Sequence, residues 1–379
     1  MEFIDLKAQY AALKKEIDES VQNVLNHGGF IMGGEVAELE EQLKEYTGRK
    51  YCVSCANGTD ALNMVLMAWD IKEGDAVFVP AFTFMSTAEV VSLRGAAPVF
   101  TDIDINTFNM DSNSLEEAVQ NVIKQGRLTP RAVIPVDLFG LPADYEKILP
   151  VAKKYNLLVL EDAAQGFGGA VNGKKACSFG EVSALSFFPS KPLGCYGDGG
   201  AVFTDDEEIY SILVSIRVHG KGTDKYDNVR VGLNSRLDTL QAAVLLPKLR
   251  AFKEYELAAR EKTGALYTSL LKDTLKTPVI PKGYTSSYAQ YTVLLDNKTQ
   301  RDELQKKLKE NGVPSMVYYP KPLHLQSVYK HLNYTPGSLP QSETASQCVL
   351  SLPMHPYLTE SETIYVTETV LKNLVEIKK

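Results

Sequence analysis

Apolar residues follow helical spacing at the start of the chain and form shorter, denser runs after residue 50. Spacings of three and four predict an amphipathic helix over residues 5–27 and a second helix over residues 35–46. The apolar positions of the first helix are Tyr10, Leu13, Ile17, Val21 and Val24. The turn between the helices mixes glycines with Phe30, Ile31 and Met32. We expect this turn to lie against a partner subunit or the active site, because apolar side chains gathered at a surface mark contacts.

From residue 50 onward, apolar runs of strand length alternate with helix-like segments. The runs are YCVSCA, AVFVPA, APVFTDID, RAVIPVDLF, LLVLEDA, VSALSFF and GAVFT. The helical patterns between them fall at residues 60–69, 83–94, 112–124 and 144–155. This alternation predicts an α/β fold with a mostly parallel sheet covered by helices on both faces. In such sheets ligands bind at the carboxyl ends of the strands, so the residues just after each strand are the most informative.

The C-terminal part of the chain has a different pattern. A long helix is expected from residue 238 to about 260, and it is followed by the alternating run YAQYTVLLD and helices at 299–310 and 360–378. We therefore predict two domains. Residues 1–260 form a large α/β domain with the N-terminal helical segment and the connecting helix, and residues 261–379 form a small α+β domain.

Composition narrows the class of protein. The 379 residues carry a net charge of -7, which argues against nucleic acid as a partner. There is no run of about 18 apolar residues and no signal-peptide pattern, so we expect a cytoplasmic protein without a membrane span. The five cysteines include Cys52 and Cys55 in a strand-like run, which favours buried reduced thiols over half of a zinc site. No metal is expected.

One lysine stands in an unusual setting. Lys191 follows the aromatic pair Phe187 and Phe188 and precedes a loop with four glycines. An amine there can be partly desolvated, which lowers its pKa and makes it a usable nucleophile. The alternative is a lysine on a tight surface turn.

Three other strand ends carry candidate chemistry. Gly58 and Thr59 open a helix, whose N-terminal N–H groups can bind a phosphate, although Asn57 or Thr59 could be an ordinary helix cap. Phe84 could stack on a planar ring or pack in the core. Asp162 ends an apolar strand, where a carboxylate is costly without a cationic partner, although it could be an internal cap.

Together these features match the parts of pyridoxal 5′-phosphate. Lys191 would form a Schiff base with the aldehyde and later carry a proton, as base and then acid. The Asp162 carboxylate would keep the pyridine nitrogen protonated, so that the ring accepts an electron pair.

Four motifs also carry a family resemblance. ANGTDAL, EDAAQGFGG, SFFPSKPLG-x-x-GDGGA and GLNSRLDTLQAA resemble those of the DegT/DnrJ/EryC1/StrS sugar aminotransferases, and the similarity spans the whole chain. The resemblance implies the type I aspartate-aminotransferase fold and a homodimer with shared active sites. It makes Lys191 the Schiff-base lysine and Asp162 the partner of the pyridine nitrogen, with Gln165 on the ring hydroxyl and Phe84 on the ring face. The phosphate contacts that it implies are Gly58, Thr59 and Ser186, with Asn234 from the other subunit.

The resemblance also suggests a substrate. It implies transfer of an amine from L-glutamate to C3 of UDP-2-acetamido-2-deoxy-3-oxo-glucuronate, in the synthesis of bacterial surface polysaccharide such as lipopolysaccharide O-antigen. The candidate substrate contacts are Arg236, Tyr318, Tyr319 and His324. Similar proteins tend to carry His-Tyr-Pro where this chain has Tyr-Tyr-Pro at 318–320. A different 3- or 4-keto sugar linked to UDP or dTDP is the alternative.

Two other functions compete with transamination. A sugar dehydratase of the same fold would carry histidine in place of Lys191, so the lysine argues against it. A non-catalytic protein that binds the cofactor, or a regulator, would have no use for the polar candidates Arg236, Tyr318 and His324. Turnover with glutamate separates these hypotheses.

Overall fold

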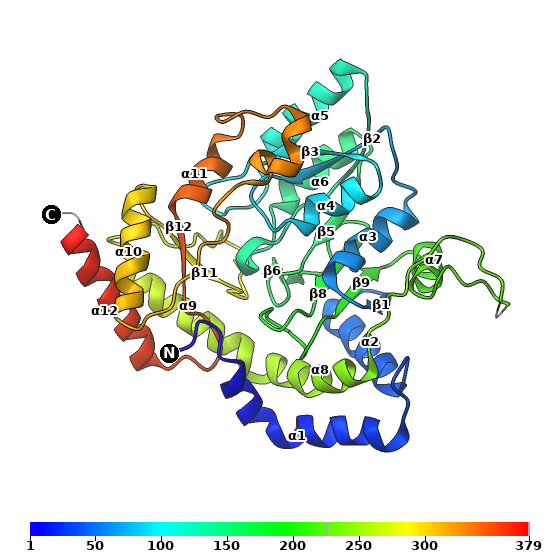
Figure 1. Cartoon of the computed structure of the whole chain (residues 1–379), viewed down its shortest axis with the longest axis horizontal. Coiled ribbons are helices and arrows are strands. Elements are labelled where there is room, and N and C mark those ends of the chain that lie inside the picture. Colours follow the sequence, from blue (N-terminus) through cyan, green and yellow to red (C-terminus); the bar gives the residue numbers. More distant parts are fainter. Residues whose placement is uncertain (225, 378–379) are drawn as a thin grey trace.

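A central sheet organises the first two thirds of the molecule (Figure 1). The computed structural model describes residues 1–224 and 226–377. Within them, the sheet has seven strands in the order β1-β9-β8-β5-β4-β2-β3. The strands are β1 (Tyr51–Cys55), β2 (Asp75–Pro80), β3 (Ala97–Thr101), β4 (Thr129–Val133), β5 (Leu158–Asp162), β8 (Val182–Ser186) and β9 (Gly200–Thr204). β9 is antiparallel to both its neighbours and the other pairs are parallel, so the mostly parallel α/β sheet is confirmed.

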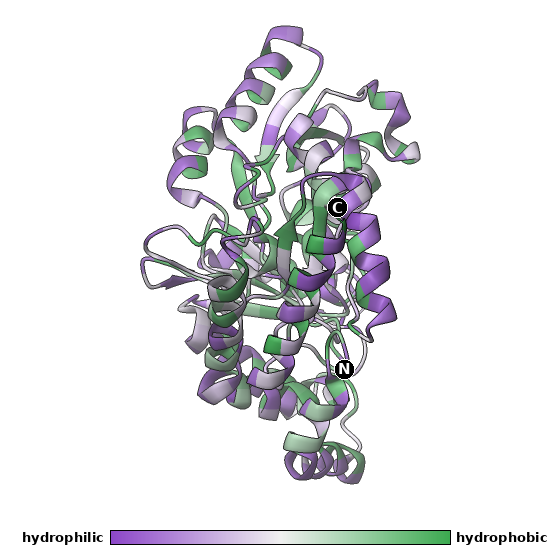
Figure 2. Cartoon of the chain, turned by 90° about the vertical axis from the view of Figure 1, so that its left-hand side faces the viewer, coloured by the Kyte–Doolittle hydropathy of each residue, from purple (hydrophilic) through white to green (hydrophobic). Residues whose placement is uncertain are grey.

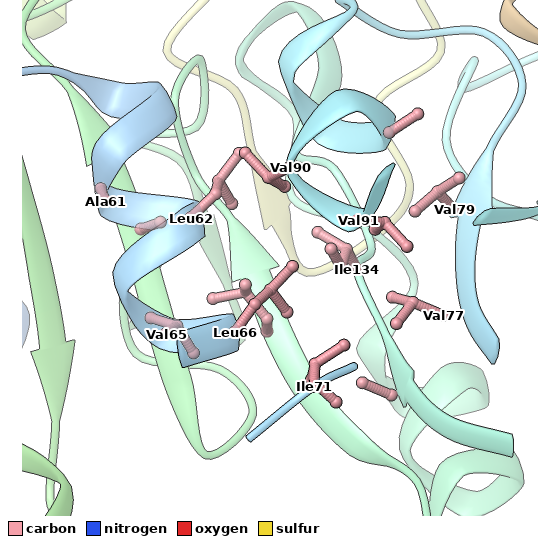
Figure 3. Packing of buried hydrophobic residues seen from close by; sticks show 14 of the residues in the cluster. Ala61, Leu62, Val65, Leu66, Ile71, Val77, Val79, Val90, Val91 and Ile134 are labelled. Atoms are coloured by element: carbon pink, nitrogen blue, oxygen red, sulfur yellow. The ribbon is translucent and has the colours of Figure 1, made fainter. Parts of the chain in front are cut away.

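Helices cover both faces of this sheet because its strands are apolar on both sides. One face packs against α3 (Gly58–Ala68), α4 (Ser86–Leu93) and α7 (Glu207–Arg217), and the other against α2 (Gly34–Thr47), α5 (Ser112–Gln125), α6 (Tyr145–Lys154) and α8 (Thr239–Ala251). Successive residues of β2 alternate between the two cores, as the strand period of two requires. Figure 3 shows Val77 and Val79 of β2 near Val90 and Val91 of α4, with Leu62 of α3 opposite.

The N-terminal segment adds two helices, as predicted. The Asp5 side chain accepts a hydrogen bond from the Ala8 N–H and begins α1 (Leu6–His27), and Gly28 ends it with a left-handed φ of 72°. Leu13 and Ile17 of α1 pack against α8. In the turn before α2, the side chains of Phe30, Ile31 and Met32 are each more than 40% exposed, so this turn is a candidate contact surface.

One helical rod joins the two halves of the chain. α8 continues through a π-helical turn, η2 (Phe252–Glu256), into α9 (Leu257–Leu271), visible along the bottom of Figure 1. The rod therefore runs well beyond the expected end near residue 260. It does so because Tyr267 and Leu271 pack in the core of the C-terminal region.

The C-terminal region is an α+β unit. β11 (Tyr291–Leu294) pairs antiparallel with β12 (Val349–Leu352), and α9, α10 (Lys298–Glu310) and α12 (Glu360–Ile377) surround the pair. The predicted helix at 360–378 is confirmed up to Ile377, and Lys378 lies outside the described residues. The turns η3 (Leu323–Leu325) and η4 (Ser327–Leu332) pack back on the large core through Leu323 and Tyr329. The division at residue 260 stays a prediction.

Several short elements were not predicted. They are η1 (Leu138–Gly140), β6 (Ala170–Val171), β7 (Lys174–Lys175), β10 (Tyr284–Thr285) and α11 (Pro340–Cys348). Cys52 and Cys55 are buried, as predicted, and Cys177, Cys195 and Cys348 are buried as well. In Figure 2, hydrophilic residues lie on the outer helices and hydrophobic ones line the strands between them. No helix in the described part of the chain is both long and apolar enough to cross a bilayer.

Candidate active site

A pocket of about 460 Å³ opens at the carboxyl edge of the central sheet. Its wall comes from the segments that follow β1, β2, β4, β5 and β8, as expected for a sheet of this kind. A second side comes from the C-terminal region. The lining residues include Asn57, Gly58, Thr59, Phe84, Ser86, Thr87, Val136, Asp162, Gln165, Ser186, Ser190, Lys191, Tyr318 and Tyr319.

Lys191 lies in a tight loop directly after β8. Its backbone N–H donates to the Phe188 carbonyl at 2.8 Å, and the Cys195 N–H closes the loop on the Phe187 carbonyl at 2.8 Å. The aromatic and apolar surroundings lower the pKa of the Lys191 amine, while the Asp162 carboxylate acts in the opposite direction. The amine is therefore more nucleophilic at neutral pH than an exposed lysine.

Asp162 ends β5 and is only 4% exposed. Its Oδ2 accepts a hydrogen bond from the Thr87 hydroxyl at 2.9 Å, and its Oδ1 accepts one from the Ala164 N–H at 3.2 Å. Burial raises the pKa of this carboxyl, while the two donors and Lys191 lower it. These contacts fix the side chain at the edge of the pocket, where it can pair with a cationic ring nitrogen.

The N-terminus of α3 forms a small polar corner of the pocket. Asn57 caps the helix, since its side chain accepts from the Asp60 N–H at 2.7 Å. A Cβ on Gly58 would lie 2.7 Å from Ser186 Cβ, so only glycine lets the helix approach β8 this closely. The hydroxyls of Thr59 and Ser86 hydrogen-bond to each other at 2.7 Å. Hydroxyls and free helix N–H groups together suit an anion such as phosphate.

Aromatic side chains form the mouth of the pocket. Phe84 is 55% exposed, and its ring centroid lies 6.2 Å from that of Tyr319. The buried Gln165 accepts a hydrogen bond from the Phe139 N–H at 2.9 Å and donates to the Tyr319 hydroxyl at 3.1 Å. Tyr318 also lines the pocket. An exposed aromatic plate above a polar base is suited to a flat ring ligand.

Three candidate residues do not line this pocket. His324 is 1% exposed, and its Nε2 lies 3.1 Å from Glu343 Oε1 beneath the loop before α11. Asn234 and Arg236 lie in the segment of residues 226–236, which we call the arm, where an Arg236 guanidinium N–H donates to Asn234 Oδ1 at 2.5 Å. Within one chain, the structure gathers the candidates around Lys191 and leaves these three elsewhere.

Some pocket residues were missed by the sequence reasoning. Thr87 is the hydrogen-bond donor to Asp162, and Ser86 pairs with Thr59. Both hydroxyls stand in the first turn of α4, directly after the segment that contains Phe84. The signal that could have found them is the same one that drew attention to Thr59, namely hydroxyls in the first turn of a helix that follows a strand.

Comparison with known proteins places this pocket in context. The profile of the DegT/DnrJ/EryC1/StrS aminotransferase family matches residues 11–371. The chain is 50% identical over 361 residues to the UDP-2-acetamido-2-deoxy-3-oxo-D-glucuronate aminotransferase of Pseudomonas aeruginosa, covering 94% of this chain and 96% of that protein. It is also 43% identical to the pleiotropic regulatory protein of Geobacillus stearothermophilus, covering 97% and 96%.

Solved structures agree with this picture. A DegT/DnrJ/EryC1/StrS aminotransferase from Brucella abortus superposes with a TM-score of 0.95 at 50% identity, covering 98% of this chain and 99% of that one. The aminotransferase-type fold is thereby confirmed. A Streptococcus pneumoniae sugar aminotransferase of the same fold, with a TM-score of 0.87 at 25% identity over 96% and 97% of the chains, was solved in its PLP form.

The pocket residues fit pyridoxal 5′-phosphate. The cofactor needs an amine, a carboxylate, a flat apolar contact and an anion site. Lys191, Asp162 and Phe84 supply the first three. The α3 N-terminus, closed against Ser186 by the absence of a Gly58 side chain, supplies the fourth.

Proposed function

The chain belongs to the DegT/DnrJ/EryC1/StrS aminotransferase family, and from this premise we propose that it moves the amino group of glutamate to C3 of a keto sugar. The sugar is UDP-2-acetamido-2-deoxy-3-oxo-glucuronate. The observation that carries this proposal is the 50% identity, over 94% of the chain, to an aminotransferase named for that substrate. We place the reaction in the cytoplasm, in the synthesis of surface polysaccharide such as lipopolysaccharide O-antigen.

The cofactor is pyridoxal 5′-phosphate, which supplies an electron sink for the electrons released when a C–H bond breaks. Lys191 would hold the aldehyde end of the cofactor. Once the substrate amine replaces Lys191 at the aldehyde end, the Lys191 Nζ would be free to remove the proton from the amino-bearing carbon and to deliver it to the cofactor carbon. The burial that lowers the pKa of this amine makes it an effective base near neutral pH.

Asp162 would hold the pyridine nitrogen in its protonated form. Its two hydrogen bonds, from the Thr87 hydroxyl and the Ala164 N–H, keep the carboxylate in one orientation and favour its ionised state. Gln165 would contact the ring hydroxyl, and Phe84 would cover the ring face.

Gly58, Thr59 and Ser186 would bind the phosphate at the polar corner of the pocket. The Thr59 hydroxyl and the first N–H groups of α3 can donate to phosphate oxygens. We assign a further phosphate contact to Asn234 of a second copy of the chain, because Asn234 does not line its own pocket.

The second copy follows from the surface around the pocket. Phe84 and Phe188 are more than half exposed there, and Phe30, Ile31 and Met32 are exposed on the turn before α2. Exposed apolar groups of this size are typical of a subunit interface. A homodimer in which Asn234 of each chain reaches the neighbouring pocket would cover them and complete both sites.

The substrate contacts are Arg236, Tyr318 and Tyr319. Tyr318 and Tyr319 line the pocket and come from the C-terminal region of the chain. An arginine pairs with a carboxylate through two parallel N–H donors, and both glutamate and the uronic acid carry carboxylates. His324 is left out of this set because it is buried against Glu343.

The test is the identity of the product. Purified protein is incubated with glutamate and a panel of UDP- and dTDP-linked 3- and 4-keto sugars, and each product is identified by mass and proton spectra. We expect an amine at C3 of the UDP-uronate. A product aminated at C4 contradicts the proposal.

Arg236→Ala should raise KM strongly for the uronate and much less for an uncharged 3-keto sugar, with the exposed Arg127→Ala as control. Equal losses for both sugars would remove the carboxylate argument.

A regulatory role is the second candidate, because one relative at 43% identity is named a pleiotropic regulatory protein. The first half of the reaction separates the two. A transaminase converts its bound cofactor to the amine form when glutamate is added, which changes the absorbance spectrum. A protein that only binds the cofactor leaves the spectrum unchanged.

A further inference from the structure

Two carboxyl groups lie behind the pocket without reaching it. Asp137 follows β4, and Glu161 is the residue of β5 directly before Asp162. Both side chains are fully buried, and neither lines the pocket. A buried acid is costly unless its charge is compensated or it keeps its proton. The hydrogen bonds around each acid show which of the two applies.

Glu161 is surrounded by donors. Its Oε1 accepts from the Cys177 N–H at 2.7 Å, and its Oε2 accepts from the Phe179 N–H at 2.7 Å and the Ser183 hydroxyl at 2.6 Å. The Arg49 guanidinium lies behind this group, within 3.3 Å of Ser183 Oγ. Three donors and a nearby cation are what an ionised carboxylate requires.

Asp137 has a different set of partners. Its Oδ1 accepts from the Ala143 N–H and from the Tyr145 hydroxyl, both at 2.9 Å. Its Oδ2 accepts from no N–H or O–H donor in residues 1–224 and 226–377. Val136 pairs with Asp162 in a parallel bridge, so Asp137 and Glu161, each one residue away, point to the same side of the sheet and their carboxyl groups interact. Two ionised carboxylates repel each other, so this contact is a hydrogen bond only when one of them carries a proton.

The partners decide where that proton lies. Both Glu161 oxygens already accept hydrogen bonds from N–H or O–H groups, whereas Asp137 Oδ2 is otherwise unused. The other ionisable groups nearby are Tyr145, Asp162, Cys177 and Arg49. Burial and the neighbouring Glu161 raise the pKa of Asp137 well above its ordinary value. Burial also raises the pKa of Glu161, but the bond from Asp137 and the three donors act against that rise.

The acid pair is attached to the catalytic segment at three points. The Asp137 N–H donates to the Asp162 carbonyl at 3.0 Å. A Cβ on Gly166 would lie 2.5 Å from Asp137 Oδ2, so the chain after Gln165 rests directly on this carboxyl. The Phe139 N–H, two residues after Asp137, donates to Gln165. Movement at Asp137 therefore moves both Asp162 and Gln165.

We propose that Asp137 is a neutral carboxylic acid that donates a hydrogen bond to the ionised Glu161, and that this pair positions Asp162 and Gln165. The pair leaves a single negative charge behind Asp162, and the three donors to Glu161 stabilise it. Asp137 is thus a positioning residue that acts without touching cofactor or substrate. This inference rests on the proposed function only in the use of Asp162, and the location of the proton is tested without it.

The first test compares two substitutions at residue 137. Asp137→Asn replaces the O–H donor with an N–H donor of the same shape, so it should rescue most of the activity lost in Asp137→Ala. The alanine variant removes the donor and the support of Gly166, and we expect kcat to fall about 100-fold, as for a misplaced catalytic group. The exposed Asp273→Asn is the matched control. If the asparagine variant loses as much as the alanine variant, the proposal is wrong.

The second test determines whether Asp137 or Glu161 carries the proton. In Glu161→Gln, the amide NH₂ opposes at least one of three fixed donors, so this variant should be less stable in urea than Asp137→Asn. The reverse order would put the proton on Glu161 and overturn the assignment. Both variants are measured as holoenzyme.

The third test uses pH, because folding keeps a proton on Asp137 that the unfolded chain releases above the ordinary pKa of 3.8. From pH 5 upward, until Asp137 ionises in the folded protein, the unfolding constant of the wild type should rise about tenfold per pH unit relative to Asp137→Asn. An infrared C=O band of a protonated acid in D₂O should be present at pH 8 and absent from the asparagine variant. If the ratio of the wild-type unfolding constant to that of Asp137→Asn does not change with pH, and no such band is seen, Asp137 is not neutral and the proposal is wrong.

Discussion

Asp162 ends a strand of the central sheet and Asn234 follows the last strand of that sheet in sequence, and their side chains are held to very different degrees. Asp162 is 4% exposed and bonded to Thr87 and Ala164 from two separate elements. Asn234 is exposed, and its side chain is held by Arg236, two residues along the same arm. The side chains around Lys191 are thus fixed by the large core, whereas the segment around Asn234 is anchored through its backbone, with the Leu233 N–H donating to the Ile216 carbonyl at 2.7 Å, and leaves the Asn234 side chain exposed.

The difference shows how the work of the site is divided. Residues of the inner wall are held by buried hydrogen bonds before any ligand arrives, which is what catalysis by positioned groups requires. In the proposed homodimer, residues of the arm would contribute only where the second copy meets them. Substitutions in the two regions should therefore fail in different ways, and the following predictions test that division in order of expected effect.

Lys191→Ala should have the largest effect, because it removes the only amine that lines the pocket within the described residues. Turnover should fall by about 10⁴-fold or more, while thermal unfolding and subunit assembly are retained. The exposed Lys309→Ala on α10 is the control. Wild-type turnover in the alanine variant would show that the role assigned to Lys191 is wrong.

Asp162→Asn should keep the cofactor bound and lower kcat about 10²- to 10⁴-fold, because a neutral amide cannot keep a ring nitrogen protonated. Its shape still allows the bond from Thr87. Absorbance measures how much cofactor the variant retains, and steady-state kinetics measure the loss in kcat. A loss below tenfold would mean that the carboxylate serves only the fold.

Asn234→Ala tests the arm. Alone, it should lower activity about 10- to 100-fold. Mixed with Lys191→Ala under conditions that exchange subunits, it should recover about one quarter of wild-type activity, since both lesions then fall on one of the two sites of each heterodimer. No recovery, with exchange verified by differently tagged chains, would place Asn234 in its own pocket or outside both.

Lys248 gives a pH-dependent test of the inner wall. Its buried amine donates to the Gly194 carbonyl, in the loop that carries Lys191, and burial lowers its pKa to about 8. Between pH 8 and 10 the folded amine is neutral and the unfolded one still charged, so wild-type stability rises with pH. Lys248→Met lacks this gain, and the difference should grow by up to about 1.4 kcal/mol per pH unit.

Urea unfolding at several pH values measures that difference, with the exposed Lys253→Met in the same helical rod as control. A difference that does not change with pH would show that Lys248 is not the group that titrates.

Tyr319→Phe should have the smallest effect. It removes the hydroxyl that accepts a hydrogen bond from Gln165 at 3.1 Å and leaves the ring in place. A net hydrogen bond of this kind corresponds to a three- to tenfold change in kcat/KM. A loss above about 100-fold would instead indicate that the hydroxyl takes a direct part in proton transfer. Tyr319 would then act in the reaction together with Lys191 and Asp162.

Strand and helix alternation predicted the sheet because each strand is apolar on both faces and ends at a glycine or polar turn. The strand-end argument drew attention to Gly58, Phe84, Asp162 and Lys191, which the structure brings into one pocket. Asn57 and Thr59 were both possible caps, and the hydrogen bond to the Asp60 N–H selects Asn57. These outcomes follow from local chemistry that a sequence displays directly.

Other features depend on packing that no local pattern records. β6 and β7 are two residues each, too short for any periodicity. His324 is five residues from Tyr319, but the turn η3 rotates it into the core beside Glu343. Thr87 reaches Asp162 only because α4 crosses the end of β5. The acid pair of Asp137 and Glu161 becomes visible only when the donors around each oxygen are counted.

The helical rod from Thr239 to Leu271 has a mechanical consequence. At about 1.5 Å per residue it is roughly 50 Å long. One end holds the Lys191 loop through Gln241, which accepts from the Tyr196 N–H at 2.9 Å, and the other end is embedded in the C-terminal core. The regular hydrogen-bond pattern of the rod is interrupted at the π turn Phe252–Glu256, so this is the point at which the rod should bend. Any tilt of the C-terminal core either bends the rod there or applies torque to the loop that carries Lys191.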